Sequence, residues 1–222
     1  MKPRLSQNRT AAMTLFEVGV VVAVVMILAA VLLPRLAIPN GRMLKINCIN
    51  NLKQVGLAYR IWEGDNGDNY PMGVSVTNYG SMEMAATGNV VQTFQVMSNE
   101  LSTPKILICP VDLYRSAANN FGCLANSNIS YFVGVDVTND AANPQMILSG
   151  DCNFEISGVP VKPGLRSFWT NDPVVWTTNR HGTIIGNIGM ADGSVQSATG
   201  VKWHYILNFQ LTGLATNRFA IP

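Results

Sequence analysis

The chain has 222 residues, a formal net charge of +2, 48% hydrophobic residues and 13% charged residues. This length suits one compact domain of roughly 100–150 residues together with a long terminal element. Lys2, Arg4 and Arg9 lie in residues 1–12 without any acidic residue, and removing them would change the formal charge from +2 to −1. Nucleic-acid binding requires a clustered basic face, so we exclude nucleic acid as a partner.

Residues 13–33 follow this basic leader as an apolar run whose single ionisable residue is Glu17. A helix of this length measures about 32 Å, which matches a hydrocarbon core of about 30 Å. The run therefore predicts a transmembrane helix; a plain anchor and a secretory signal peptide are the alternatives, although the run exceeds the apolar core of a signal peptide. A carboxylate at this depth costs about 2.5–3.5 kcal/mol, so Glu17 is expected to have a partner or a function.

The sequence around Glu17 reads Ala-Ala-Met-Thr-Leu-Phe-Glu-Val over residues 11–18. It resembles the processing site of type IV prepilins and type II secretion pseudopilins, in which Gly and Phe usually stand where this chain has Ala12 and Met13. The resemblance implies that a prepilin peptidase cuts between Ala12 and Met13 and methylates the new amine of Met13. It also implies that Glu17 pairs with the N-terminal amine of a neighbouring subunit during filament assembly. Such an ion pair would remove the unpaired charge and set the axial register between subunits.

Pro34 lies at a position where many pilins also carry a proline. By that resemblance it belongs to the assembly region, which loosens when a subunit leaves the membrane for the filament. The alternative is that Pro34 and Pro39 simply end the helix, because proline removes one hydrogen bond and clashes with the preceding turn. Basic residues flank the apolar run on both sides, so charge alone does not orient it; the resemblance of the leader places the N-terminus in the cytoplasm.

Residues 34–64 are predicted to continue as the amphipathic half of the N-terminal helix. Apolar side chains recur there at spacings of three and four residues, and Gly64 is a suitable stop. The members of this stripe are Leu44, Cys48, Leu52, Val55, Tyr59 and Trp62.

Residues 65–222 are predicted to form an extracytoplasmic, β-rich globular domain. The fold class is α+β, with a mostly antiparallel sheet packed on the N-terminal helix. A hairpin is expected at Ala191-Asp192-Gly193, and a final helix over Val201–Leu211, closed by Gly213. The expected strands are Phe94–Met97, Ile106–Cys109, Ser130–Val137, Met146–Ser149, Val174–Thr177, Asn187–Met190 and Ser194–Gln196.

Several motifs extend the resemblance beyond the leader. Residues 48–58 are very like the stretch that follows the membrane helix in a large group of bacterial prepilin-type proteins. An Asp/Asn-rich turn ending in proline (residues 65–71) and a Cys-Pro-x-Asp motif (residues 109–112) follow, as in that group. The group also carries a His, nine residues and then Asp-Gly; here ten residues separate His181 from Asp192-Gly193. The extra residue indicates a bulge or a longer loop, and we assign His181, Asp192 and Gly193 structural roles.

Four cysteines in a domain that faces an oxidising compartment favour disulfides. The positions of Cys48 and Cys109 resemble those shared in the prepilin-type group, which implies that they pair and leave Cys123 and Cys152 as the remaining pair. The alternative is that one or both pairs are buried thiols. None of the four has the spacing of a zinc site.

Oxygen-bearing side chains crowd the turn that contains Asp65 and Asp68, and calcium binds oxygen-rich turns of this kind. No glutamate closes a twelve-residue loop there, so a plain solvated turn is favoured, and no cofactor is expected.

An enzymatic role is not expected. His181 and His204 are the only histidines, and the sequence contains no nucleophile elbow or phosphate loop. A couple of His181 with Asp192 is the one acid/base alternative. Trp169, Trp176 and Trp203 would form a glycan platform if they were exposed together, but packing in the core is the favoured role.

These observations predict a pilin-like or pseudopilin-like structural subunit of the bacterial inner membrane, with a single membrane pass and a periplasmic or extracellular C-terminal domain. Its expected partners are the membrane, other pilin-like subunits, the prepilin peptidase and the inner-membrane assembly platform. The alternative function is a stand-alone, membrane-anchored binding or hydrolytic domain that keeps its leader.

Overall fold

The computed structural model describes residues 14–36, 41–139, 144–169, 172–178, 180, 184–200 and 216–222. The chain divides into two compact units, Met1–Asn40 and Gly41–Pro222. The cleavage residues Ala12 and Met13, together with His181, Trp203, His204 and the helix expected over residues 201–211, lie outside the described residues.

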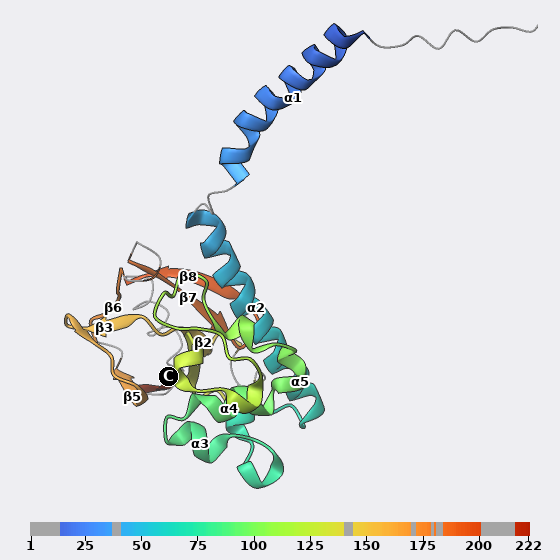
Figure 1. Ribbon diagram of the computed structural model, residues 1–222. Coiled ribbons are helices and arrows are strands. Elements are labelled where there is room, and N and C mark those ends of the chain that lie inside the picture. Colours follow the sequence, from blue (N-terminus) through green and yellow to red (C-terminus); the bar gives the residue numbers. More distant parts are fainter. Residues whose placement is uncertain are drawn as a thin grey trace, which may run out of the picture. The chain divides into compact units, whose positions relative to one another are not determined.

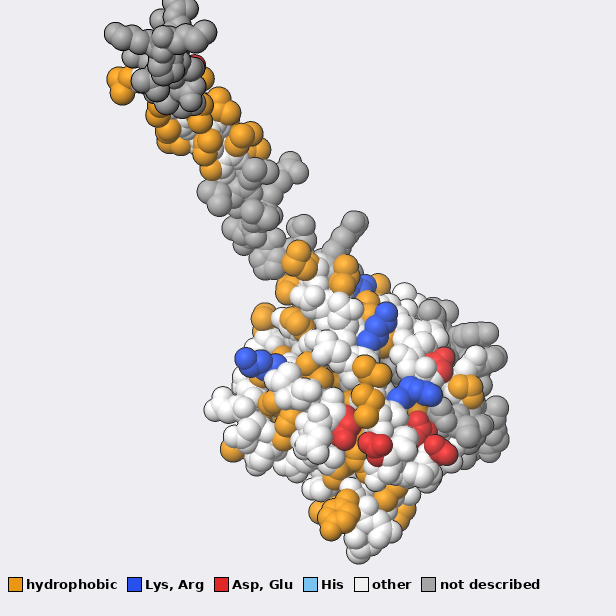
Figure 2. Space-filling view, turned by 90° about the vertical axis from the view of Figure 1, so that its right-hand side faces the viewer, with side chains coloured by type: hydrophobic (Ala, Val, Ile, Leu, Met, Phe, Trp, Pro, Cys, Tyr) orange, Lys and Arg blue, Asp and Glu red, His pale blue; other side chains and the backbone are white. Residues whose placement is uncertain are grey.

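The first unit contains helix α1 (Leu15–Leu36), which includes Pro34. Its described side chains are exposed from residue 14 to residue 31, with Ala29 alone half-buried. Figure 2 shows this surface as nearly continuous hydrophobic colour. Within the described ranges, no helix combines the length and the apolarity that crossing a membrane requires. The predicted transmembrane run of residues 13–33 begins and ends beyond the residues whose side chains are described.

The second unit begins with helix α2 (Gly41–Asp65), which ends one residue after the predicted stop at Gly64. The helix predicted over residues 34–64 is thus present as α2 from residue 41, and residues 37–40 before it lie outside the described part. The predicted apolar stripe faces the interior: Cys48, Leu52, Val55, Tyr59 and Trp62 are all buried, and Leu44 is half-buried.

A six-stranded antiparallel sheet forms the centre of this unit, with strand order β5-β9-β1-β2-β7-β8. Helix α2 contacts β7, β2 and β8. In sequence order, the strands are β1 (Tyr131–Gly134), β2 (Ile147–Asp151), β5 (Gly164–Trp169), β7 (Ile185–Met190), β8 (Val195–Thr199) and β9 (Thr216–Ile221).

A small antiparallel sheet packs beside the large one, with strand order β4-β3-β6. Its strands are β3 (Phe154–Ile156), β4 (Val159–Pro160) and β6 (Val174–Trp176). Aromatic side chains from both sheets form one core cluster, in which Trp176 of β6 lies so close to Gly186 of β7 that a side chain there would meet the indole at 2.3 Å. A separate core cluster joins α2 to the segment before the strands.

That segment is mostly short helices: α3 (Met82–Ala86), α4 (Val90–Val96) and α5 (Ser98–Leu101), with single 3₁₀ turns η1 (Pro71–Gly73), η2 (Val76–Asn78), η3 (Pro104–Leu107), η4 (Phe121–Cys123) and η5 (Asn126–Asn128). Two predicted strands are therefore wrong. Phe94–Met97 belongs largely to α4, whose N-cap Asn89 accepts a hydrogen bond from Val91 N, and Ile106–Cys109 overlaps η3, which begins at Pro104.

The other predicted strands are confirmed in place, since residues 130–137, 146–149, 174–177, 187–190 and 194–196 each overlap a strand. The predicted hairpin joins β7 to β8: Gly193 takes a φ of 81°, and Ser194 N donates to Asp192 Oδ1 at 2.8 Å. Strands β3, β4, β5 and β9 were not predicted.

Candidate functional site

The N-terminal site residue Glu17 caps its own helix. Thr14 N and Thr14 Oγ1 both donate to Glu17 Oε2 at 3.2 Å, and Glu17 N donates to Thr14 Oγ1 at 3.3 Å. This reciprocal arrangement is a capping box, which satisfies backbone N–H groups that the first helical turn leaves unpaired. The donors are neutral, and among the described residues no ion pair to Glu17 is recorded. This local role of Glu17 was not predicted, although the Thr-x-x-Glu spacing is typical of a capping box.

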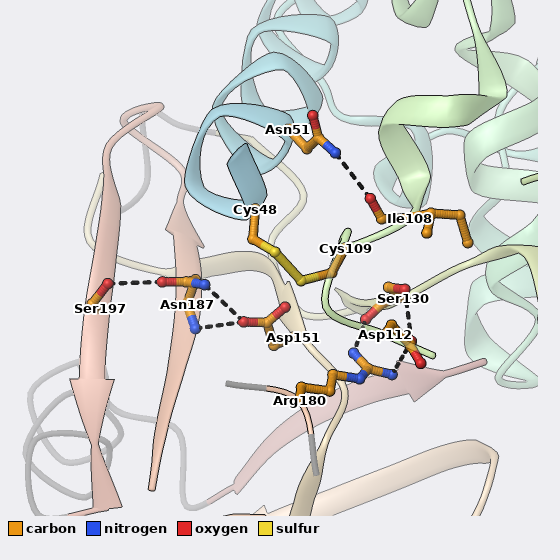
Figure 3. The surroundings of a disulfide bond; sticks show 10 residues. All are labelled: Cys48, Asn51, Ile108, Cys109, Asp112, Ser130, Asp151, Arg180, Asn187 and Ser197. Atoms are coloured by element: carbon orange, nitrogen blue, oxygen red, sulfur yellow. Dashed lines mark hydrogen bonds and ion pairs between the residues drawn. A yellow bond between two sulfur atoms is a disulfide. The ribbon is translucent and has the colours of Figure 1, made fainter. Parts of the chain in front are cut away.

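In the second unit, motif residues that lie far apart in the sequence meet beside Cys48 and Asn51 of α2 (Figure 3). Cys48 and Cys109 form a disulfide with a sequence separation of 61 residues, which is the pairing that the resemblance implies. A covalent link that closes a loop of this size stabilises a fold by about 2–4 kcal/mol. One turn further along α2, Asn51 Nδ2 donates to Ile108 O at 2.9 Å, so the helix is bound to the Cys-Pro-x-Asp segment by two adjacent contacts.

Asp112, the last residue of the Cys-Pro-x-Asp motif, is buried in an ion pair. Its Oδ2 lies 2.7 Å from Arg180 Nη2 and accepts a hydrogen bond from Ser130 Oγ at 2.8 Å. Arg180 Nη1 also donates to the main-chain oxygen Ser130 O at 2.8 Å, so each of these three residues contacts the other two. Removing one partner of such a buried pair costs about 3–5 kcal/mol, because the other charge is left uncompensated.

Cys152 borders the same cluster. Its Sγ accepts hydrogen bonds from Arg115 Nη1 at 2.9 Å and from Arg180 Nη2 at 3.2 Å. Arg115 Nη1 also contacts Ile129 O, and its Nε lies 4.0 Å from Asp112 Oδ2. The predicted disulfide between Cys123 and Cys152 is wrong: both are free thiols, with Cys123 exposed and Cys152 buried.

A second buried polar chain crosses the central sheet. Asp151 Oδ2 accepts from Asn187 N at 2.8 Å and from Asn187 Nδ2 at 2.9 Å, and Asn187 Oδ1 accepts from Ser197 Oγ at 2.7 Å. These contacts connect β2, β7 and β8 through side chains in addition to the backbone ladder. The chain satisfies groups that would otherwise be costly to bury, so its evident role is to fix the register of the sheet.

The electrostatics follow from burial and close charges. Burial lowers the pKa of Arg180, but Cys152, Asp151 and Asp112 raise it by more, so the pKa lies above its ordinary value and the guanidinium stays charged. Burial also raises the pKa of Tyr131 well above its usual range; the charge of Asp151 adds to this effect and that of Arg180 opposes it.

The Asp-Gly hairpin lies against α2 and the turn after it. Tyr70 Oη donates to Ala191 O at 2.9 Å, and Arg60 Nη1 donates to the same oxygen at 3.3 Å. Asp192 serves the turn itself through its bond to Ser194 N, which agrees with the structural role assigned from the sequence. The alternative couple of His181 with Asp192 involves His181, which lies outside the described residues.

The Asp/Asn-rich turn is held by backbone and amide hydrogen bonds. Asp68 N and Asn66 N both donate to Glu63 O, and Asn66 Nδ2 donates to Trp62 O. Among the described residues, no three His, Cys, Asp or Glu side chains gather closely enough to hold a metal ion.

Of the tryptophans named for a glycan platform, Trp176 is buried and Trp169 is more than half exposed, so these two do not share an exposed surface, and Trp203 lies outside the described residues.

A pocket of about 210 Å³ opens beside the charged cluster, with Asp112, Arg115, Cys152, Asn153, Thr177 and Arg180 among the residues that line it. Sequence reasoning missed Arg115, Cys152 and Arg180 as a group. The acidic residue after Cys-Pro was the only available signal, because a buried carboxylate requires a cationic partner, but nothing in the sequence identifies that partner. Comparisons with known protein families, curated protein sequences and solved structures found no match to this chain.

Proposed function

We propose that the chain is a pilin-like or pseudopilin-like structural subunit, processed between Ala12 and Met13 and assembled into a filament through its N-terminal helix. Residues 13–33 would reside in the inner membrane before assembly and in the filament core afterwards. The unit that begins at Gly41 would face the periplasm or the cell exterior. Its partners would be other pilin-like subunits, the prepilin peptidase and the inner-membrane assembly platform, and no catalytic step is assigned to it.

The observation that carries this proposal is the exposed apolar surface of α1. Large side chains around the helix are open to solvent, including Leu15, Val21, Met26 and Val31, each more than half exposed. An apolar surface of this extent is rare on a soluble protein and marks a site that lipid or another protein covers. Assembly with other copies of the same helix would bury it.

Glu17 fits a pairing role that leaves its helix cap in place. Both recorded side-chain hydrogen bonds go to Oε2, and both donors are neutral. A neighbouring subunit's methylated amine would approach Oε1 and supply the positive charge that the cap does not. The ion pair would offset the cost of a carboxylate in an apolar filament core.

The disulfide supports placement of the second unit outside the cytoplasm. Bonds such as Cys48–Cys109 persist in oxidising compartments and are rare where thiols are kept reduced. The alternative function, a stand-alone anchored binding or hydrolytic domain, would share this compartment but would keep its leader. Intact-mass analysis of the protein from cells separates the two, because only the filament proposal requires a mature chain that begins with methylated Met13.

A pair of substitutions tests the charge of Glu17 apart from its capping role. Glu17→Gln keeps an acceptor at the third helical position, where Gln also serves a capping box, but it removes the charge. Thr14→Ala removes the cap, at about 0.5–2 kcal/mol of helix stability, but it keeps the charge. We expect Glu17→Gln to be processed normally and to yield no filaments, whereas Thr14→Ala still assembles.

The measurement is electron microscopy of sheared surface or periplasmic filaments, with mass spectrometry of the subunit in the membrane fraction. Thr14→Ser, which retains the hydroxyl, is the matched control. Normal filaments from Glu17→Gln, or loss of filaments only in Thr14→Ala, would show that helix capping is the function of Glu17 and would refute the proposed ion pair.

A further inference from the structure

Cys152 has two guanidinium contacts that the other free thiol, Cys123, lacks among the described residues. Its sulfur accepts one hydrogen bond from each of two guanidinium groups, at 2.9 Å from Arg115 and 3.2 Å from Arg180. Cys123 is exposed, and no charged partner is recorded for it among the described residues. The thiolate is the nucleophilic form of cysteine, and adjacent arginines favour it.

Two carboxylates also belong to this cluster, and Arg180 compensates one of them. Asp112 pairs with Arg180 and accepts from Ser130, while Asp151, the residue before Cys152, accepts two hydrogen bonds from Asn187. Tyr131, the third ionisable neighbour, is kept neutral because burial raises its pKa. Arg115 Nη1 donates to both Cys152 Sγ and Ile129 O, its Nη2 donates to Pro222 O at 3.2 Å, and its Nε is 4.0 Å from Asp112 Oδ2.

The sulfur also borders open space. Cys152 is 8% exposed as a residue and lines the pocket of about 210 Å³ together with Arg115, Asn153 and Thr177. A pocket of this volume admits a molecule of a few heavy atoms and excludes a folded protein partner. Polar side chains and two guanidinium groups on its wall suit a small polar reactant.

We propose that Cys152 is a modification site, at which a small peroxide oxidises a thiolate held between Arg115 and Arg180. The sulfur attacks one peroxide oxygen, an S–O bond forms and the O–O bond breaks. The sulfur loses two electrons and becomes a sulfenic acid; the attacked oxygen keeps its proton, and the other oxygen leaves as hydroxide, which solvent protonates. Arg115 supplies positive charge where the leaving oxygen becomes negative.

The pH dependence of thiol reactivity tests this proposal without relying on absolute rates, which burial also affects. An ordinary thiol with a pKa of about 8.5 gains roughly 80-fold in thiolate between pH 6 and pH 8. The full-length protein in mild detergent, with its disulfide intact, is treated with iodoacetamide or hydrogen peroxide, and peptide mass spectrometry follows Cys152 and Cys123 in the same digest. We expect the rate at Cys152 to change by less than about threefold over this range, and peroxide to give a dimedone-trapped product there first.

Substitution of Arg115 provides the matched control. Arg115→Met removes the charge and should restore a rise of at least tenfold between pH 6 and pH 8, whereas Arg115→Lys should keep the flat profile. A steep rise at Cys152 in the unmodified chain, or no reaction there with either reagent, would overturn the proposal. This result stands on the wild-type protein alone, so it remains decisive even if a variant fails to fold.

Discussion

At the scale of single residues, the buried carboxylate of Asp112 is held in a closed set of contacts. Asp112 is satisfied by Arg180 and Ser130, and each of the three contacts the other two. The sequence motif contains His181. In the structure, however, the buried carboxylate of Asp112 pairs with Arg180, the residue before that histidine. Hydrophobic periodicity identifies which face of an element is buried, but it carries no information about which distant cation reaches a buried acid.

Tyr59 makes a prediction about alkaline stability. Burial raises the pKa of Tyr59 far above its ordinary value, the neighbouring Tyr70 adds to the effect, and within the described structure its hydroxyl has no hydrogen-bond partner. The folded chain keeps this phenol neutral, whereas the unfolded chain ionises it near pH 10. Its contribution is therefore fully present below pH 10 and is lost at higher pH, at about 1.4 kcal/mol per pH unit.

The test compares urea unfolding of the wild type and Tyr59→Phe between pH 8 and pH 11. We expect the phenylalanine variant to lose less free energy of unfolding over this range, because it has no buried phenol to ionise. Tyr114→Phe alters an exposed tyrosine and should follow the wild type. An identical pH dependence of the free energy of unfolding in all three proteins would contradict the predicted contribution of the Tyr59 phenol.

At the scale of elements, the sequence predicted those whose local pattern and tertiary setting agree. The stripe on α2 and the β7–β8 hairpin were found because spacing and an Asp-Gly turn each specify one conformation. Phe94–Met97 was mistaken for a strand because a short apolar run does not distinguish a strand from a buried helix. Strand β9 was not predicted. It pairs with β1 and β5, and pairing over long sequence distances leaves no signal in the local sequence.

Two glycines of β7 make a matched prediction about how the two sheets pack. A side chain at Gly186 would overlap the ring of Trp176, with the nearest atom at 2.3 Å, whereas one at Gly189 would meet Leu52 at an ordinary 3.5 Å. We expect Gly186→Ala to destabilise the fold by about 1–3 kcal/mol through overpacking. Gly189→Ala should be near neutral, and thermal unfolding with Trp fluorescence measures both. Equal effects would mean that the indole of Trp176 moves aside freely.

At the scale of the whole molecule, the two units differ in how much apolar surface they expose. The unit from Gly41 onward packs many of its aromatic side chains into two buried core clusters, and a disulfide joins α2 to the segment before the strands. The unit before it exposes apolar side chains on its described surface. Composition alone predicted the apolar segment, because one part of the chain concentrates the hydrophobic excess, but the predicted boundaries lay after residues 33 and 64 and not after Asn40. The apolar pattern does not identify the partner that covers α1, because lipid and apolar protein surfaces favour the same side chains.

Separating the units makes the final prediction. A chain of residues 41–222 should fold on its own in aqueous buffer and remain monomeric, because this part forms its own compact unit and the exposed apolar helix is absent. The chain from Met13 should instead require detergent or assemble.

Val25→Glu places a second carboxylate on the exposed surface of α1 at a cost of about 2.5–3.5 kcal/mol in an apolar setting and should abolish assembly. Val76→Glu, at an exposed position of the second unit, should leave assembly unchanged. Sedimentation and electron microscopy measure each species, and filaments formed by residues 41–222 alone would show that assembly does not depend on α1.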